Sequence, residues 1–308
     1  MSTPPPNGQQ FPPNNQRPQN GQPYGEQYTQ PYPPVPPGGR QYPPTPPPRR
    51  MSRGARIALA IGIPVLALLL LLGLAIAIVG ATRTGPISES IDAAAGSSVV
   101  LDVPNAVIAL SPSDDDDVHV TLSGEYAGAT PTLEVTDVDG ETVITGGCPR
   151  GWFVFNRCSV RIEVTLPADL DVTSDGQNGS VTASSLDGDL DLSTTNGSIL
   201  VNKASGVLDL GTTNGRIELT DSRSREVEAE TTNGAVRLEF AEAPEQVSAE
   251  STNGEILVRV PDDNQSSRVE ADTTNGSVET ADILTDPDSD RSISANTTNG
   301  RVTIEQAG

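Results

Sequence analysis

The stretch "LDLSTTNGSILV" (residues 190–201) contains a four-residue phrase that recurs through the second half of the chain. Around each copy, apolar and polar residues alternate, which is the pattern of half-buried strands. The repeats therefore predict pairs of strands that meet at each Asn-Gly. Thr-Thr-Asn-Gly occupies 194–197, 212–215, 231–234, 273–276 and 297–300, Ser-Thr-Asn-Gly occupies 251–254, and the looser Gly-Gln-Asn-Gly occupies 176–179.

The spacing between copies grows along the chain, while the four-residue sequence around each Asn-Gly, where a corner is predicted, stays nearly the same. Successive Asn-Gly pairs lie 18, 18, 19, 20, 22 and 24 residues apart, and the segments that connect them differ in length and composition. One edge of the structure is therefore predicted to be constant, and the opposite edge is free to vary. The asparagines expected to form a structural ladder along the constant edge are Asn178, Asn196, Asn214, Asn233, Asn253, Asn275 and Asn299.

Two architectures fit this pattern. Asn-Gly between alternating strands is the strongest short signal for a hairpin, so one is a meander of antiparallel hairpins. The other is a β-solenoid, in which each repeat forms one coil and equivalent residues stack. A meander gives no reason for threonine before every turn, whereas stacked hydroxyls and amides form hydrogen-bonded ladders at about 4.8 Å. We therefore favour an all-β solenoid of about seven coils over residues 170–308, with Asn and Gly turning each corner through left-handed backbone angles.

Residues 1–56 are predicted to form a disordered tail, and residues 57–79 a transmembrane helix. The first fifty residues hold 17 of the 27 prolines, and such a segment buries too little apolar surface to offset the entropy of ordering it. The 23 residues of 57–79 carry no charge and measure roughly 34 Å as a helix, enough to cross a bilayer core. Arginines gather before this segment, which predicts a cytoplasmic N-terminus. The alternative, a cleaved signal peptide, has a shorter apolar region.

After a linker at 80–96, the chain is expected to lie outside the cytoplasm. Residues 81–308 carry 40 acidic and 13 basic residues, a net charge of −27, against −22 for the whole chain. This charge repels nucleic acid and anionic lipid headgroups, so nucleic acid is excluded as a partner. Both cysteines, Cys148 and Cys158, belong to this part, and in an oxidising compartment they most simply form a disulfide.

Residues 97–169 are predicted to be a β capping region ahead of the repeats. Short alternating runs there are rich in β-branched residues and are bounded by Gly, Pro, Asp or Ser. Three aromatic residues, Trp152, Phe153 and Phe155, lie between the two cysteines. One interpretation is that this loop plugs the end of the solenoid, and the other is an exposed aromatic tip that grips a ligand.

The stretch "VRIEVTLPADLDVTSDGQNGSVTASSLDGDLDLSTTNGSI" (160–199), following an apolar anchor and a β-rich segment, resembles the bacterial putative-adhesin family of β-strand-repeat proteins. The resemblance covers roughly residues 90–306. It implies a β-solenoid on the outer surface of the membrane, with adhesion as the role. It brings no catalytic motif, and members of the family also occur beside envelope-stress regulators.

Candidate chemical sites are few. Asp114–Asp117 offer carboxylates to calcium, but without the ligand spacing and glycines of calcium loops they are typical of an acidic turn. His119 has no nucleophile or carboxylate motif beside it. Alternating acidic residues, as in Asp187, Asp189 and Asp191, occur in some polysaccharide lyases, but here they recur in almost every repeat, which is typical of solubility and edge protection. We therefore expect no enzyme activity, no catalytic residue, no metal and no cofactor.

The predicted function is that of a non-enzymatic, membrane-anchored adhesin-like protein that contacts a cell-wall glycan or another envelope or extracellular ligand through outward Thr, Asn and Asp. The alternative is envelope-stress sensing or accessory signalling, with the tail binding a cytoplasmic partner through its polyproline pattern at Pro44 and Pro47. The last repeat, "GRVTIEQAG" (300–308), lacks an evident cap, so we expect edge-to-edge self-association there.

Overall fold

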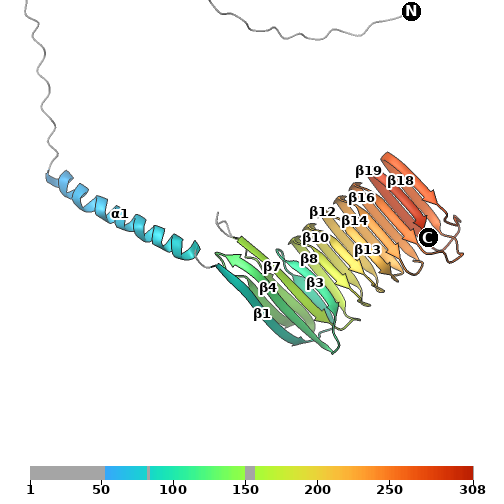
Figure 1. The fold of residues 1–308 in the computed structure, drawn as a ribbon, viewed down its shortest axis with the longest axis horizontal. Coiled ribbons are helices and arrows are strands. Elements are labelled where there is room, and N and C mark those ends of the chain that lie inside the picture. The colour runs from blue at the N-terminus through green and yellow to red at the C-terminus, as the bar shows by residue number, and fades with distance from the viewer. Residues whose placement is uncertain (1–52, 82–83, 150–156, 308) are drawn as a thin grey trace, which may run out of the picture. The chain divides into compact units, whose positions relative to one another are not determined.

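The computed structural model describes residues 53–81, 84–149 and 157–307 (Figure 1). Pro44, Pro47 and the aromatic residues 152, 153 and 155 lie outside the described residues. One helix, α1 (Arg53–Ala81), contains residues 57–79, the segment predicted to cross the membrane, and begins within the predicted disordered tail, at residue 53. Its described leucines, isoleucines and valines are at least half exposed. Within the described residues, no helix reaches the length and hydropathy required to span a membrane.

From residue 84 onward the described chain contains strands, turns and loops, which confirms the all-β prediction. Strands form because β-branched and leucine side chains alternate with polar ones, so that each strand buries one face. The strands are β1 (Thr84–Ala94), β2 (Ser98–Asp102), β3 (Val107–Pro112), β4 (Asp117–Ala127), β5 (Thr132–Val138), β6 (Glu141–Gly147), β7 (Arg157–Leu166), β8 (Asp171–Asn178), β9 (Val181–Ser184), β10 (Leu190–Asn196), β11 (Ile199–Asn202), β12 (Leu208–Asn214), β13 (Ile217–Ser222), β14 (Glu226–Asn233), β15 (Val236–Phe240), β16 (Gln246–Asn253), β17 (Ile256–Val260), β18 (Arg268–Ala281) and β19 (Ser292–Gln306).

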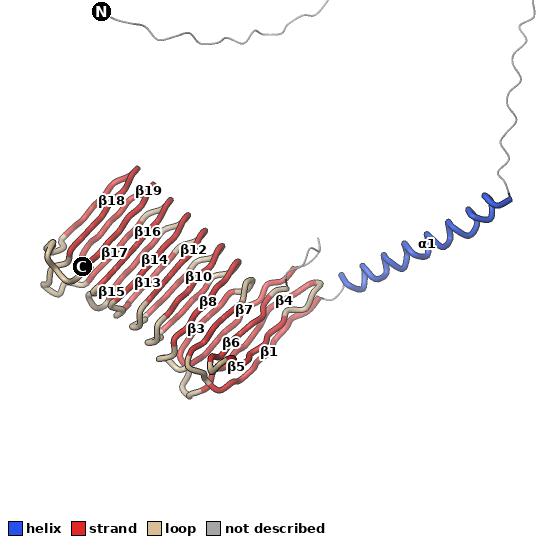
Figure 2. The backbone as a smooth tube through the Cα atoms, turned by 180° about the vertical axis from the view of Figure 1, so that it is seen from behind, coloured by secondary structure: helices blue, strands red, loops and turns tan. Residues whose placement is uncertain are grey.

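The repeats pair in parallel, so they form the coils of a solenoid and not a meander of hairpins. One run of strands has the order β5-β6-β2-β8-β10-β12-β14-β16-β19-β18. The other has the order β1-β4-β7-β3-β9-β11-β13-β15-β17-β19-β18. The two runs meet at the Asn-Gly corners, and the longer loops gather along the opposite side (Figure 2).

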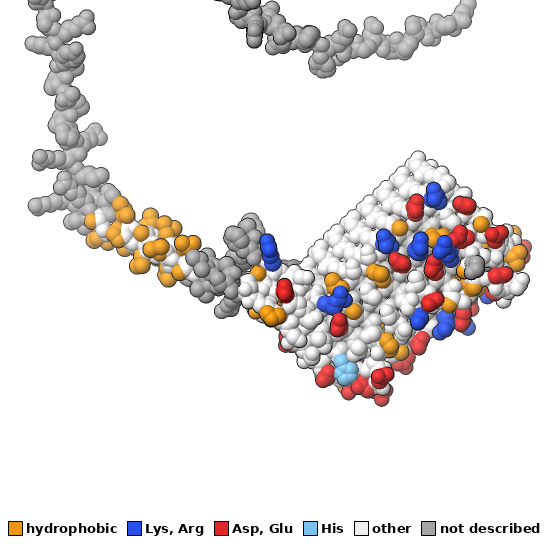
Figure 3. Space-filling view, in the orientation of Figure 1, with side chains coloured by type: hydrophobic (Ala, Val, Ile, Leu, Met, Phe, Trp, Pro, Cys, Tyr) orange, Lys and Arg blue, Asp and Glu red, His pale blue; other side chains and the backbone are white. Residues whose placement is uncertain are grey.

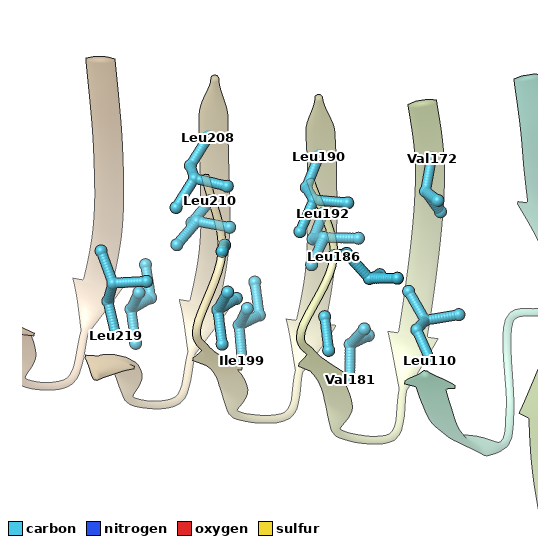
Figure 4. Packing of buried hydrophobic residues seen from close by; sticks show 14 of the residues in the cluster. Leu110, Val172, Val181, Leu186, Leu190, Leu192, Ile199, Leu208, Leu210 and Leu219 are labelled. Carbon is cyan, nitrogen blue, oxygen red and sulfur yellow. The ribbon is translucent and has the colours of Figure 1, made fainter. Parts of the chain in front are cut away.

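The core lies between the two runs of strands. Leu190 and Leu192 of β10 and Ile199 of β11 point into it, and their equivalents in the next coil stack beside them (Figure 4). Leu186, from the loop that precedes β10, is also fully buried and closes the side opposite the corner. Small side chains such as Ala229 occupy equivalent inward positions in later coils, which keeps this core thin.

The parallel stack extends past residue 170, the expected start of the repeats. β2 and β3 form a further coil beside β8 and β9, and β6 and β7 form another beside β2 and β3. Antiparallel strands then flank that coil, with β5 beside β6 and β4 and β1 beside β7. The region expected to be a cap therefore contributes coils as well as a cap.

The other end of the stack does not follow the order of the chain. β19 lies between the preceding coil, β16 and β17, and the strand β18, which comes before it in sequence. In Figure 1 the orange strand β18 lies outside the red strand β19. The expectation that 300–308 forms the free edge is wrong, because residues 302–306 pair with β17 and residues 300–305 pair with β18.

Glycine is needed at the corners because neighbouring backbones approach closely. A Cβ placed on Gly234 would lie 1.6 Å from the carbonyl oxygen of Gly215 in the preceding coil. The expected left-handed Asn is not found, since no corner asparagine has a positive φ. Left-handed residues occur instead along the variable edge, at Ser185, Lys203 and Asp221.

This close approach predicts that Gly234→Ala destabilises the protein by about 1–3 kcal/mol, the usual cost of overpacking. Gly211→Ala is the matched control, because a Cβ on Gly211 would meet its nearest atom only at 3.9 Å. Urea unfolding of both variants measures the effect. Equal midpoints for the two would contradict the packing account of the corner.

Candidate binding surface

The first hydroxyl residue of each Thr/Ser-Thr-Asn-Gly corner holds one coil to the next, and it is buried except at Thr273 of the last coil, where it is half-buried. The Thr212 hydroxyl donates to the carbonyl oxygen of Gly197 at 3.0 Å, and the Thr231 hydroxyl donates to that of Gly215 at 3.2 Å. Ser251, which replaces threonine in its repeat, makes the same bond to Gly234 at 3.1 Å. The sequence reasoning expected hydroxyl ladders, but the acceptor is the glycine carbonyl and not another hydroxyl. The remaining bonds of this kind are Thr194 to Gly179, Thr297 to Gly254 and Thr273 to Gly300.

All seven asparagines expected at the constant edge form one continuous amide ladder. Each side-chain Nδ2 donates to the Oδ1 of the neighbouring coil, as from Asn214 to Asn196 at 3.0 Å. Because every amide is donor to one neighbour and acceptor for the other, the ladder has a single direction. The other steps are Asn196 to Asn178, Asn233 to Asn214, Asn253 to Asn233, Asn299 to Asn253 and Asn275 to Asn299.

An eighth asparagine, Asn105, begins the ladder and was missed by the sequence reasoning. Its Oδ1 accepts from Asn178 Nδ2 at 2.8 Å. It lies at the corner between β2 and β3, where alanine follows it instead of glycine. The available signal was the asparagine directly before the alternating run "AVIAL" (106–110), which matches the other corners except for glycine.

The second threonine of each corner faces solvent and leaves an exposed column of hydroxyls. The asparagine amides are exposed beside them, so the two columns form a strip of hydroxyl and amide groups repeated about every 4.8 Å. We call these two columns the polar strip. A band with neither charged nor apolar side chains is visible along one edge of the strands in Figure 3. In stack order, its threonines are Thr195, Thr213, Thr232, Thr252, Thr298 and Thr274.

Acidic residues flank the polar strip on the first run of strands. A shallow hollow of about 300 Å³ brings Glu230, Glu250 and Asp272 beside Thr252 and Thr274. In an earlier coil, partial burial raises the pKa of Asp191, and the neighbouring carboxylates of Asp209 and Asp175 raise it further. The surface next to the strip therefore offers many hydrogen-bond acceptors and favours ligands that are uncharged or cationic.

The disulfide lies at a corner of the stack. Cys148 and Cys158 are bonded at 2.07 Å and close the loop between β6 and β7. In this coil the disulfide stands where later coils have Thr-Thr-Asn-Gly, and the Cys148 N–H donates to the carbonyl oxygen of Asn105 in the neighbouring coil. A covalent bond thus holds the corner of the first parallel coil.

The single histidine lies between two carboxylates near the start of the β region. His119 Nδ1 is 2.8 Å from Asp92 Oδ1 on β1, and Nε2 is 3.0 Å from Asp115 Oδ1. The hydrogen bonds to Asp92 and then to Asp115 raise the pKa of His119. This cluster joins β1 to β4, and the Ser113 hydroxyl donates to the same Asp115 Oδ1 at 2.6 Å. Within the part of the chain that the structure describes, no three His, Cys, Asp or Glu side chains form a candidate metal site.

A larger hollow lies on the variable edge, among loops of the last coils. It has a volume of about 1,020 Å³ and includes Arg223, Arg225 and Arg291. Each of these arginines already pairs with an acidic side chain, Glu242, Glu245 and Asp263 respectively. The hollow therefore presents no concentrated positive charge to a ligand.

The repeats match a known protein family. Residues 194–306 match the family model described as Toastrack DUF4097. This part of the chain is similar to Toastrack domains. The matched segment contains all six full copies of the Thr/Ser-Thr-Asn-Gly corner. The predicted resemblance to the bacterial putative-adhesin family is confirmed for residues 194–306. No curated protein sequence matches the chain.

The chain also matches solved structures at low sequence identity. A putative adhesin from Bacteroides fragilis is 14% identical with a TM-score of 0.44, and the match covers 74% of this chain and 99% of that one. A putative adhesin from Parabacteroides merdae is 14% identical with a TM-score of 0.41, covering 74% and 98%. A putative lipid binding protein from Parabacteroides distasonis is 13% identical with a TM-score of 0.30, covering 73% and 97%.

The buried threonine bonds predict a difference between the two threonines of one Toastrack corner. Thr231→Val removes the hydroxyl that bonds Gly215, and we expect a loss of about 1 kcal/mol of unfolding free energy. Thr232→Val changes the exposed neighbour and is expected to stay within about 0.5 kcal/mol of the parent. Denaturant titrations compare them, and an equal or reversed order of stability would count against the ladder.

The histidine cluster predicts a pH dependence. Because both ring nitrogens face carboxylates, His119 is expected to titrate above its ordinary pKa of about 6.5. Its contribution to stability is then complete below the unfolded-state pKa and is lost as the pH rises through the folded-state pKa. An NMR titration of the imidazole, the chain's only one, measures this, with Asp92→Asn expected to lower the pKa. A value at or below 6.5 in the parent protein would refute the pairing.

Proposed function

We propose that this protein is a non-enzymatic adhesin-like protein whose Toastrack domain binds an extended, uncharged or cationic glycan along the polar strip. The observation that carries the proposal is the continuity of the strip. The exposed threonines recur in six successive coils without interruption, beside an unbroken asparagine ladder. A polymer with its own repeat would meet hydroxyl and amide groups at every step, so that many weak hydrogen bonds add up.

The charge of the domain supports the choice of ligand. Residues 81–308 carry a net charge of −27, and the hollow beside the strip is lined by Glu230, Glu250 and Asp272. Carboxylates accept hydrogen bonds from sugar hydroxyls but repel phosphate and carboxylate groups on a polymer. A cell-wall glycan without anionic substituents fits this surface better than an acidic polysaccharide or a nucleic acid.

The proposal includes a membrane anchor, with the N-terminus inside the cell and the Toastrack domain outside. The described apolar side chains of α1 are exposed, including Leu68, Leu70 and Leu71 at 63–66%, and such a surface requires cover by lipid or protein. The Cys148–Cys158 disulfide supports an oxidising, extracytoplasmic location for the β region. The arginines near the start of the apolar segment support the orientation.

The test is a pull-down of the full chain in mild detergent by insoluble, acid-stripped cell-wall glycan. Thr213→Ala together with Thr232→Ala removes two hydroxyls from the strip, and we expect binding to weaken about tenfold. Thr182→Ala together with Thr303→Ala is the matched control, because these threonines lie on the outer face of the other run of strands.

Deletion of residues 1–48 separates this function from signalling through the tail, since glycan binding is expected to survive it. Binding that is unchanged in the strip variant, or equally weak in the control, would overturn the assignment of the strip. A localisation assay with protease added to intact cells tests the anchor independently, with the Toastrack domain expected to be cleaved or labelled from outside.

A further inference from the structure

The end of the stack at β18 is an open edge. Among the described residues, β18 forms a ladder with β19 alone, along both of its arms from Arg268 to Ala281. Its opposite edge therefore presents backbone N–H and C=O groups along fourteen residues. Such an edge is a template for another strand unless something covers it.

The inward side chains of β18 are more exposed than the side chains at the same positions in the neighbouring coils. Val278 is 43% exposed, whereas Val302 and Ile256, its equivalents in the two coils beneath, are at most 1% exposed. Val269 and Ala271 are only partly buried at positions where the preceding coils are fully buried. Leu284, in the loop after β18, is 52% exposed. The apolar interior of the solenoid is thus open at this end.

The amide ladder also ends without a partner coil. Asn275 donates its Nδ2 to Asn299 Oδ1, but it lies in the last coil, so no further asparagine of the ladder donates to its own Oδ1. A primary amide has a second N–H and a free acceptor. Two such amides facing each other are self-complementary, which is the property that an interface with two-fold symmetry requires.

From these observations we infer that β18 is a self-association surface, and that its occupant is the β18 of a second copy of this chain. A two-fold axis near the Asn275–Gly276 corner would place the two corners against each other, with the strands antiparallel and each arm beside the other arm of its partner. The pairing would cover Val269, Ala271 and Val278 on both copies. At the opposite end of the stack, the outermost described strands, β1 and β5, lack the Thr-Thr-Asn-Gly corner and so do not present an equivalent surface.

Charge limits the strength of this contact. Glu270, Asp272 and Glu279 of β18 face outward and would approach the same residues of the partner. Repulsion between exposed carboxylates falls as salt is added, because the screening length shrinks to about 3 Å at 1 M ionic strength. We therefore expect a dimer that strengthens as salt is raised.

Analytical ultracentrifugation of the full chain in detergent micelles measures the dimer. Val278→Lys puts a charge into the uncovered interior, and we expect it to abolish dimerisation. Leu200→Lys is the matched control, since Leu200 is a similarly exposed apolar residue, 38% against 43%, in the middle of the stack. The control also accounts for association through α1, which neither substitution touches. A monomeric parent at high salt, or a dimer that Val278→Lys leaves intact, would overturn the inference.

Cross-linking tests whether the two β18 corners meet at the proposed two-fold axis. Both native cysteines are in the disulfide, so a single introduced cysteine is the only free thiol. Thr274→Cys lies beside Asn275 and is expected to be joined rapidly to its copy by a short bis-maleimide. Thr232→Cys, an equally exposed member of the same column three coils inward, is expected to react with the reagent without forming dimers. Equal dimer yields from the two variants would contradict the proposed axis.

Discussion

The structure depends on the stacking of one corner upon another at the spacing of parallel strands. At this corner the backbones approach so closely that only glycine fits, and the buried hydroxyl of the first threonine bonds the glycine carbonyl of the neighbouring coil. The asparagine amide continues the contact on the outside. Because each corner supplies both donors and acceptors to its neighbours, identical corners satisfy each other along the stack.

The same constraint produces the surface that we assign to binding. In each corner, hydrogen bonds and close contacts with the neighbouring coil involve the first threonine, the asparagine and the glycine. The second threonine faces solvent. Repetition for stability therefore creates a regular exposed array. The loops of the opposite edge are not under this constraint, which explains why the distance between corners grows from 18 to 24 residues. They close the core with single residues such as Leu186 and otherwise vary.

Much of this could be predicted from the sequence, because alternation and the Asn-Gly corners are local signals. The inward positions of Val227, Ala229 and Thr231, and of Val236 and Leu238 after the corner, are buried in the structure. The role of glycine was misjudged, since a close approach between coils is a tertiary contact that looks the same in sequence as a left-handed turn. Asn105 was missed because its corner lacks glycine.

The order of the coils was the part that local pattern did not reveal. The last coils all carry the same corner, so β18 and β19 match the face of β16 and β17 equally well by sequence. Only the long connecting segments before and after β18 indicated this order. The chain must skip the position beside β16 and β17 to form β18, and then return to fill that position with β19. The same arrangement places β2 and β3 between later strands at the other end of the stack.

Disulfide trapping between paired cysteines tests this stack most directly. Cysteines at Thr252 and Thr298 occupy neighbouring coils about 4.8 Å apart, within the reach of a disulfide, whereas cysteines at Thr252 and Thr274 lie two coils apart. The account predicts rapid oxidation of the first pair and none of the second. A disulfide between positions 252 and 274, with none between 252 and 298, would show that the coils stack in chain order and would contradict the structure described.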